Sequence, residues 1–315
     1  MKPASITRHL TRHGIFLLVL LLSGPGIPIQ AATFEFGVGG WQQIPKGSVA
    51  YTYNVADIAI NTTQGVVHDL FPLTDSLLDQ LSSRMNKVIG DVIPGADPNG
   101  VLEEIFTRTD TLDFQDDCRY DPVIRPTGRL KIQVSPYLNF YFMATPIVFD
   151  GPGQADLDFN FMGVTFISGQ PFESKLRLTH FDVAYFIDLP DQSMGKNWEL
   201  HTDVGLNARI VDFYAAISQD ATDLSASADY VVPLPMLYLS AQLKNKNTLS
   251  IEAEARGLRY SGDYTYSLVG RMRMHISGPL HLAAGYRHDY IKLDVHDIDS
   301  EGTFYGPFME TVLIF

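Results

Sequence analysis

This chain has few cysteines, few charges and no long apolar run after its N-terminus, and each shortage excludes a class of protein. Its one cysteine, Cys118, cannot form an internal disulfide, and in an oxidising compartment it is free or paired with another molecule. Beyond residue 31 there is no run of about 18 apolar residues, which argues against a membrane-spanning helix. Yet 45% of the residues are hydrophobic and only 19% are charged, so the chain can bury a large core and is not typical of disorder.

The N-terminal segment is basic, then apolar, then small. Lys2, Arg8 and Arg12 precede the apolar run 15–22, and Ala31 and Ala32 follow. This order predicts a cleavable signal peptide over residues 1–31 and a mature chain over 32–315. The mature chain keeps 20 basic and 36 acidic residues, a net charge of −16. Since binding to nucleic acid depends on cationic side chains, we expect no nucleic acid partner.

Period-two alternation recurs along the mature chain. From Leu249 to Arg256, apolar side chains occupy every second position and Ser250, Glu252, Glu254 and Arg256 occupy the others. Segments around 200–210, 237–243, 268–276 and 282–290 alternate in the same way. Apolar-out and polar-in alternation is typical of strands in a membrane barrel, where all backbone groups must be paired within the protein. The sequence therefore predicts an all-β fold, a transmembrane antiparallel β-barrel.

We expect about ten strands, and an even number places both ends of the barrel chain on one side. They are 33–53, 127–135, 138–150, 173–189, 197–217, 231–244, 248–262, 264–277, 280–296 and 302–315. Within the fourth of these, Leu176 and Leu178 lie in one register but Phe181, Val183 and Tyr185 lie in the other. The slip predicts a β-bulge near Thr179 and His180.

The connection 54–126 is the longest in the chain. Apolar residues recur at helical spacing over 73–89, which predicts a partly helical insert between the first two strands. The sequence is compatible with two positions for this insert: a cap over the mouth of the barrel, or a segment folded into the lumen.

The chain closes on an apolar and aromatic segment that ends in Phe315. Outer-membrane barrels of Gram-negative bacteria commonly finish this way, and the export signal agrees. We therefore expect a monomer in the outer membrane whose partners are lipid, lipopolysaccharide and, through Phe315, the barrel-assembly machinery.

The inward positions carry charges of both signs. A lumen charge network is predicted for Arg177, Arg209, Glu252, Glu254, Arg256, Arg271, Arg273, Arg287 and Asp289. Barrels of this size are filled by side chains, and buried charges must be paired. We therefore expect a structural role or the transport of a small solute through a narrow path. A wide porin channel is not expected, because it usually needs about sixteen strands.

An alternative is a barrel hydrolase that acts on lipopolysaccharide or peptides. His180 with Asp182 and His201 with Asp203 are His-x-Asp pairs on neighbouring predicted strands, so their side chains could converge. Histidines in a polar lumen are more often hydrogen-bonded than metal-bound, and the acidic groups near 113–121 and 294–301 lack EF-hand spacing. We therefore predict no metal and no cofactor.

Four short motifs resemble segments of an uncharacterised family of proteobacterial outer-membrane β-barrel proteins. They are LTHFD at 178–182, PMLYL at 235–239, GYR at 285–287 and GPF at 306–308. The resemblance covers about 33–53 and most of 128–315, and it implies a fold and a location but no activity.

Overall fold

The computed structural model describes residues 32–54, 107–245, 248–260, 263–295 and 298–315. These residues form strands, turns and one short 3₁₀ helix at Asp220–Thr222, and none of the described helices could cross a membrane. The strands are β1 (Thr33–Asn54), β2 (Thr107–Asp113), β3 (Val123–Ser135), β4 (Leu138–Thr145), β5 (Val148–Gln154), β6 (Phe159–Phe161), β7 (Val164–Phe166), β8 (Pro171–Ser193), β9 (Trp198–Gln219), β10 (Leu224–Asn245), β11 (Leu249–Tyr260), β12 (Asp263–Ser277), β13 (Leu280–Val295) and β14 (Ile298–Ile314).

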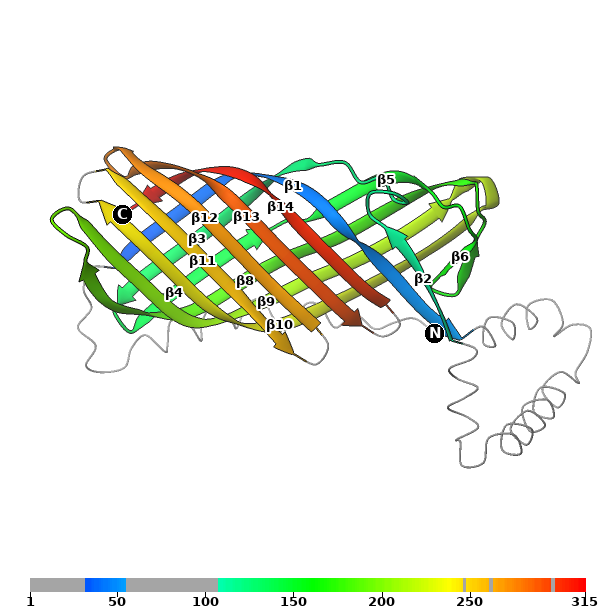
Figure 1. The fold of residues 1–315 in the computed structure, drawn as a ribbon, viewed down its shortest axis with the longest axis horizontal. Coiled ribbons are helices and arrows are strands. Elements are labelled where there is room, and N and C mark those ends of the chain that lie inside the picture. Colours follow the sequence, from blue (N-terminus) through cyan, green and yellow to red (C-terminus); the bar gives the residue numbers. More distant parts are fainter. Residues whose placement is uncertain (1–31, 55–106, 246–247, 261–262, 296–297) are drawn as a thin grey trace, which may run out of the picture.

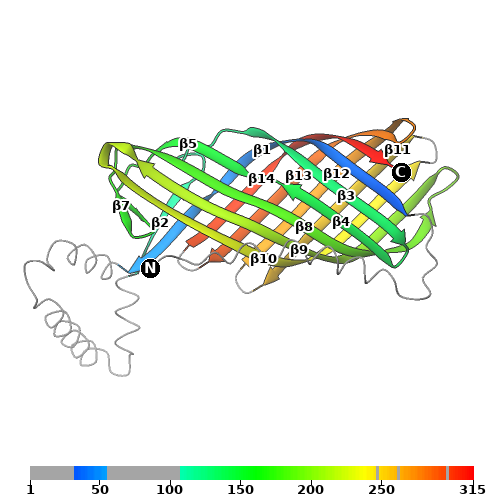
Figure 2. The same cartoon turned by 180° about the vertical axis from the view of Figure 1, so that it is seen from behind.

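Ten antiparallel strands close into a barrel (Figures 1 and 2). The order around the wall is β1, β3, β4, β8, β9, β10, β11, β12, β13 and β14, and β14 pairs with β1 over its full length to seal the cylinder. Strand β5 continues the position of β4 along β8, after a break at Pro146, which has no N–H to donate. The predicted all-β barrel of about ten strands is confirmed.

Two predictions concern the connection 54–126. Residues 107–113, expected to lack a strand, form β2, which extends the wall by pairing with the end of β1 from Asn54 to Ser48. This part of the expectation is wrong, because only Leu112 of these seven residues is apolar and the segment carries no apolar alternation. The predicted helix over 73–89 and the signal peptide lie outside the described residues.

The start of β1 and the end of β14 meet at one end of the barrel, here called the termini end. Phe34 N donates to Phe315 O, and Phe315 N donates to Phe34 O. Tight turns at 136–137 and 278–279 tie the wall there, through bonds from Asp188 N to Pro136 O and from Ile314 N to Pro279 O. Strands β2, β5, β6 and β7 gather at the opposite end, here called the far end (Figures 1 and 2).

The predicted β-bulge near Thr179 is wrong. Residues 173–189 of β8 pair with 218–202 of β9 without a register shift, and residues 172–186 alternate strictly between inward and outward positions. What changes is the polarity of each face. Leu176 and Leu178 point inward, and so do His180 and Asp182 further along the same face. The barrel therefore inverts its polarity between Leu178 and His180, with an apolar interior toward the far end and a polar interior toward the termini end.

An apolar core fills the far half. Phe149 stacks between Tyr120 and Phe304 at centroid distances of 5.7 Å, and Phe304 also stacks on Phe114 at 6.4 Å. The cluster continues through inward residues of several strands, including Leu178, Val211, Phe213, Leu234, Ile291 and Leu293. Such packing stabilises the wall where no charge network does.

Cys118 lies in this far core, in the turn between β2 and β3. It is a free thiol with 4% of its surface exposed, and burial raises its pKa to about 11. A thiol that stays protonated is a weak nucleophile and a poor metal ligand. The cysteine is therefore a packing residue in this fold.

The polarity of the outer surface also changes along the barrel axis, near the level of Leu178 and His180. Toward the termini end it exposes a continuous apolar belt that includes Phe36, Phe181, Leu206, Ile210, Leu237, Leu239, Ile251, Leu268, Met272, Leu282 and Met309. Toward the far end the outward positions carry pairs such as Arg177 with Asp212 and Lys292 with Asp299. At the border on β12 to β14, Tyr266 stacks on Tyr290 at 5.2 Å and on His288 at 5.6 Å, as an aromatic girdle would.

Candidate functional site

Inside the termini half, charges of both signs are present in equal number. Among the described residues the buried acidic groups are Glu35, Asp182, Asp203, Glu252, Glu254, Asp289 and Glu310, and the buried basic groups are Arg129, Lys131, Arg209, Arg256, Arg271, Arg273 and Arg287. Seven negative and seven positive groups leave this layer with no net charge apart from its histidines. Each charge needs a partner, because an unpaired charge in a buried site is costly.

A chain of ion pairs crosses the lumen from wall to wall. Arg129 of β3 contacts Glu35 of β1 and lies 2.9 Å from Glu310 of β14. Glu35 also lies 2.6 Å from Arg273 of β12. Four strands are therefore joined by charge across the interior as well as by backbone hydrogen bonds along the wall.

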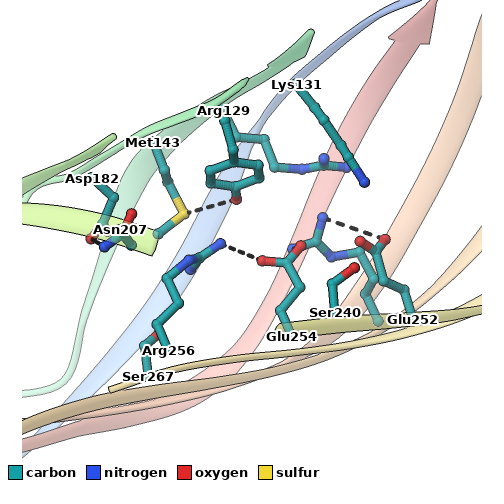
Figure 3. A network of polar contacts seen from close by, with 12 residues as sticks. Arg129, Lys131, Met143, Asp182, Asn207, Ser240, Glu252, Glu254, Arg256 and Ser267 are labelled. Carbon is teal, nitrogen blue, oxygen red and sulfur yellow. Dashed lines mark hydrogen bonds and ion pairs between the residues drawn. The ribbon is translucent and has the colours of Figure 1, made fainter. Parts of the chain in front are cut away.

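A second part of this layer lies between β11, β12 and two tyrosines. Arg256 points at Glu254 (Figure 3), and Glu254 also lies 2.7 Å from Arg271. The guanidinium of Arg256 lies 4.6 Å from the ring centroid of Tyr141 and 5.3 Å from that of Tyr238. Cation–π contacts of a desolvated guanidinium add to the ion pairs and fill the lumen with rigid side chains.

The His180 cluster consists of His180, Asp182, Arg209, Arg287 and Asp289. Arg209 binds Asp182 through two hydrogen bonds of 2.9 and 3.1 Å, and Arg287 binds Asp289 at 2.5 Å. His180 Nε2 lies 3.8 Å from Asp182 and 3.7 Å from Asp289. All five side chains are buried, directly under the apolar core, so the cluster has no opening for a substrate.

The His201 cluster consists of Lys131, Asp188, Asp191, His201 and Asp203, near the termini end. Lys131 Nζ lies 2.7 Å from Asp203 Oδ2, and His201 Nε2 lies 2.9 Å from Asp203 Oδ1. On the other side of the ring, His201 Nδ1 lies 2.6 Å from Asp191 Oδ1. A β-bulge between Leu189 and Gln192 directs Asp191 toward the ring.

The two His-x-Asp pairs that the sequence suggested for catalysis do not meet. Asp182 pairs in register with Arg209, whereas Asp188 pairs with Asp203, so the pairs lie six residues apart along β8. Six residues of strand correspond to about 20 Å. Each pair belongs to its own ion network, and the four residues do not form one constellation.

Arg177, which the sequence placed in the lumen, lies on the outer surface. It pairs with Asp212 at 2.9 Å and lies over the ring of Tyr214 at 5.0 Å. The misplacement follows from the assumed bulge, which put the two halves of β8 in different registers. The other predicted network residues are buried in the lumen.

Several lumen residues were not predicted as site residues. Glu35, Arg129 and Lys131 belong to the network, and Asp188 and Asp191 to the His201 cluster. The first three alternate with apolar neighbours at Phe34, Phe36, Leu130 and Ile132, so reading the first two strands by twos could have found them. Asp191 needs the bulge, which the sequence does not signal.

The acidic segment 113–117 is used as a turn. Asp113 Oδ1 accepts bonds from Gln115 N at 2.7 Å and Asp116 N at 2.9 Å, and Asp117 Oδ2 accepts from Asp113 N at 2.8 Å. These carboxylates cap backbone N–H groups between β2 and β3.

Two cavities show how the lumen is filled. At the termini end a hollow of about 320 Å³ opens between Glu35, Lys131, Lys244, Arg273 and His281. Deeper, beside Trp41, Arg129 and Arg287, the cavity holds about 20 Å³. That space is close to the smallest that accepts one water molecule.

Comparisons with known proteins add the following. No protein-family model matches the chain, and no curated protein matches it in sequence, so the resemblance to an uncharacterised family stays a prediction. Solved structures that it resembles include the outer membrane protease OmpT from Escherichia coli, at 9% identity over 92% of this chain and 99% of that chain, with a TM-score of 0.45. Others are Ail of Yersinia pestis in complex with a heparin analogue, at 5% identity over 91% and 100% and a TM-score of 0.30, and the Pseudomonas putida toluene transporter TodX, at 8% over 94% and 93% and a TM-score of 0.24. At this similarity these structures assign no function and no residue role to this chain.

Proposed function

We propose that this protein is a monomeric outer-membrane β-barrel with a sealed lumen and a structural role. The observation that carries the proposal is the sequence of layers along the barrel axis. A neutral network of seven acidic and seven basic groups lies directly under an apolar core, and the cavity between Arg129, Arg287 and Trp41 holds about 20 Å³. Side chains of the described residues fill both layers, which disfavours a continuous aqueous path for a solute.

The outer surface supports the location. The apolar belt surrounds the termini half and ends at a level marked by Tyr266 and Tyr290, beyond which outward positions carry charge. A hydrocarbon layer of about 30 Å needs only 9–11 residues of tilted strand, whereas β8, β9 and β10 have 23, 22 and 22. The remaining length stands in water as a rigid extension, and the predicted signal peptide over residues 1–31 agrees with export to the outer membrane.

A sealed lumen predicts electrically silent bilayers. The refolded protein, added to planar lipid bilayers in 1 M salt at increasing voltage, is expected to give no discrete conductance steps. The variants Arg271→Ala and Arg273→Ala test the alternative of a charged solute path. If the native protein conducts, and Arg271→Ala or Arg273→Ala changes its ion preference, a narrow transport role replaces the structural one.

A further inference from the structure

Three ligand-type atoms converge in the His201 cluster. One oxygen from each of Asp188 and Asp203 and one ring nitrogen of His201 lie within 4.8 Å of one another. His201 and Asp203 are 9% and 2% exposed, and neither His201 Nε2 nor Asp203 Oδ1 has a hydrogen-bond partner despite their separation of 2.9 Å. Asp203 is buried and Asp188 is half-buried, and two carboxylates that face one ring nitrogen need a positive charge between them, either a cation or a proton on that nitrogen.

The surrounding groups fix the direction of each ligand atom. Asp191 Oδ1 lies 2.6 Å from His201 Nδ1, so a proton on Nδ1 is held by this carboxylate and Nε2 points toward Asp188 and Asp203. When Nε2 carries no proton, its lone pair faces these two carboxylates. Lys131 and Ser240 donate to Asp203 Oδ2 at 2.7 and 2.8 Å, which leaves Oδ1 for the centre of the cluster. A carboxylate on the remote nitrogen of a metal-ligating histidine is the usual outer partner in metal sites.

The Asp188 carboxylate is positioned by Asn139, through the oxygen that lies 3.8 Å from His201 Nε2. Asn139 Nδ2 donates to Asp188 Oδ1 at 2.9 Å. Three carboxylates, those of Asp188, Asp191 and Asp203, face the ammonium of Lys131, and the charge of Lys244 also acts on Asp191 and His201. With a neutral imidazole, the cluster keeps an excess of one negative charge. A divalent cation would offset it.

We infer that Asp188, His201 and Asp203 form a binding site for a divalent transition-metal ion near the termini end of the lumen. One imidazole nitrogen with two carboxylate oxygens suits Zn²⁺ and leaves a fourth tetrahedral position open. An ion that prefers oxygen ligands alone, such as Ca²⁺ or Mg²⁺, is disfavoured by the nitrogen ligand. The ion joins the neighbouring strands β8 and β9 at the termini end of the lumen.

The test is calorimetric titration of ZnCl₂ into the refolded full-length mature chain in detergent. The expected result is one Zn²⁺ per chain, with Mg²⁺ failing to compete at equal concentration. The variants Asp188→Asn and His201→Ala are expected to weaken binding by at least about 100-fold, and Asp191→Asn, which only orients the ring, by about 10–100-fold.

His281→Ala is the matched control. His281 lies at the same mouth, with its ring 4.9 Å from that of His275 and Nδ1 3.2 Å from Pro279 O, outside the His201 cluster. Its binding constant is expected to stay within about 2-fold of the native value, and circular dichroism confirms that every variant is folded. The inference is overturned if the native chain binds no Zn²⁺, because a second proton on His201 then supplies the charge. Equal losses in His281→Ala and His201→Ala overturn it as well.

Discussion

Replacing Arg209 with alanine is expected to destabilise the barrel by about 3–5 kcal/mol, the usual cost of breaking a buried ion pair. Arg209 is fully buried and holds both oxygens of Asp182 at 2.9 and 3.1 Å. Without it, Asp182 keeps the bond from Asn207 at 2.8 Å and the nearby ring of His180, but it remains a buried charge beneath an apolar core with no arginine partner. The measurement is urea unfolding of the protein refolded in lipid vesicles, followed by tryptophan fluorescence.

Two variants accompany this experiment. Arg177→Ala removes a similar ion pair from the outer surface, where side chains are solvated, and should cost no more than about 1 kcal/mol. Replacing Arg209 and Asp182 together by leucine removes both charges and should recover most of the loss. If Arg177→Ala and Arg209→Ala lower the unfolding free energy equally, the lumen network does not stabilise the barrel as described.

Placing an arginine at position 237 is expected to cost about 2–4 kcal/mol, the value for a charge on the lipid face near the bilayer midplane. Leu237 of β10 is 51% exposed on the outer surface and pairs with Leu206 of β9 in the middle of the apolar belt. An arginine there must carry its charge into hydrocarbon or distort the bilayer around it. The same vesicle unfolding assay gives the difference in free energy.

Ser227→Arg is the matched control on the same face of the same strand. Ser227 lies ten residues toward the far end, beyond the level at which the outer surface becomes polar. A surface substitution in water is expected to change the unfolding free energy by no more than about 0.5 kcal/mol. A cost at Ser227 equal to that at Leu237 would place both positions in the same medium and remove the proposed border.

Period two was sufficient to predict most of the wall. Strands β11 to β14 separate leucines and methionines from glutamates and arginines cleanly, because there one face meets lipid and the other a polar lumen. The predicted bounds 264–277 and 280–296 differ from Asp263–Ser277 and Leu280–Val295 by one residue. The even number of strands was predicted for the same reason.

The errors have one physical origin. Strands longer than the membrane extend from lipid into water. In the part that stands in water the outward side chains are polar and the inward ones are apolar. The sequence of an unbroken strand therefore shows the same change of phase as a strand with a β-bulge. This reversal produced the expected bulge at Thr179 and the misplacement of Arg177. It leaves Phe172, Leu176 and Leu178 in one apolar core rather than on a lipid-facing surface.

The sequence pattern indicated only two of the residues in the candidate metal site. His201 and Asp203 stand out as a pair on one face of a strand, but Asp188 comes from the neighbouring strand and Asp191 from a bulge. Which residues of two strands face each other depends on register, and register is set by pairing along the whole wall. Single-strand spacing could not supply it.

The inversion of polarity in the middle of the barrel wall is tested most directly by a depth profile along β10. Nitroxide labels are attached one at a time at outward positions 225, 227, 229, 237, 239 and 241, with Cys118 replaced by serine, and their collision rates with oxygen and with a water-soluble nickel chelate are compared in vesicles. Labels at 237, 239 and 241 are expected to favour oxygen, which concentrates in lipid, and those at 225, 227 and 229 the nickel chelate. Equal preference at all six positions, or a preference for nickel at 237 and 239, would contradict the account.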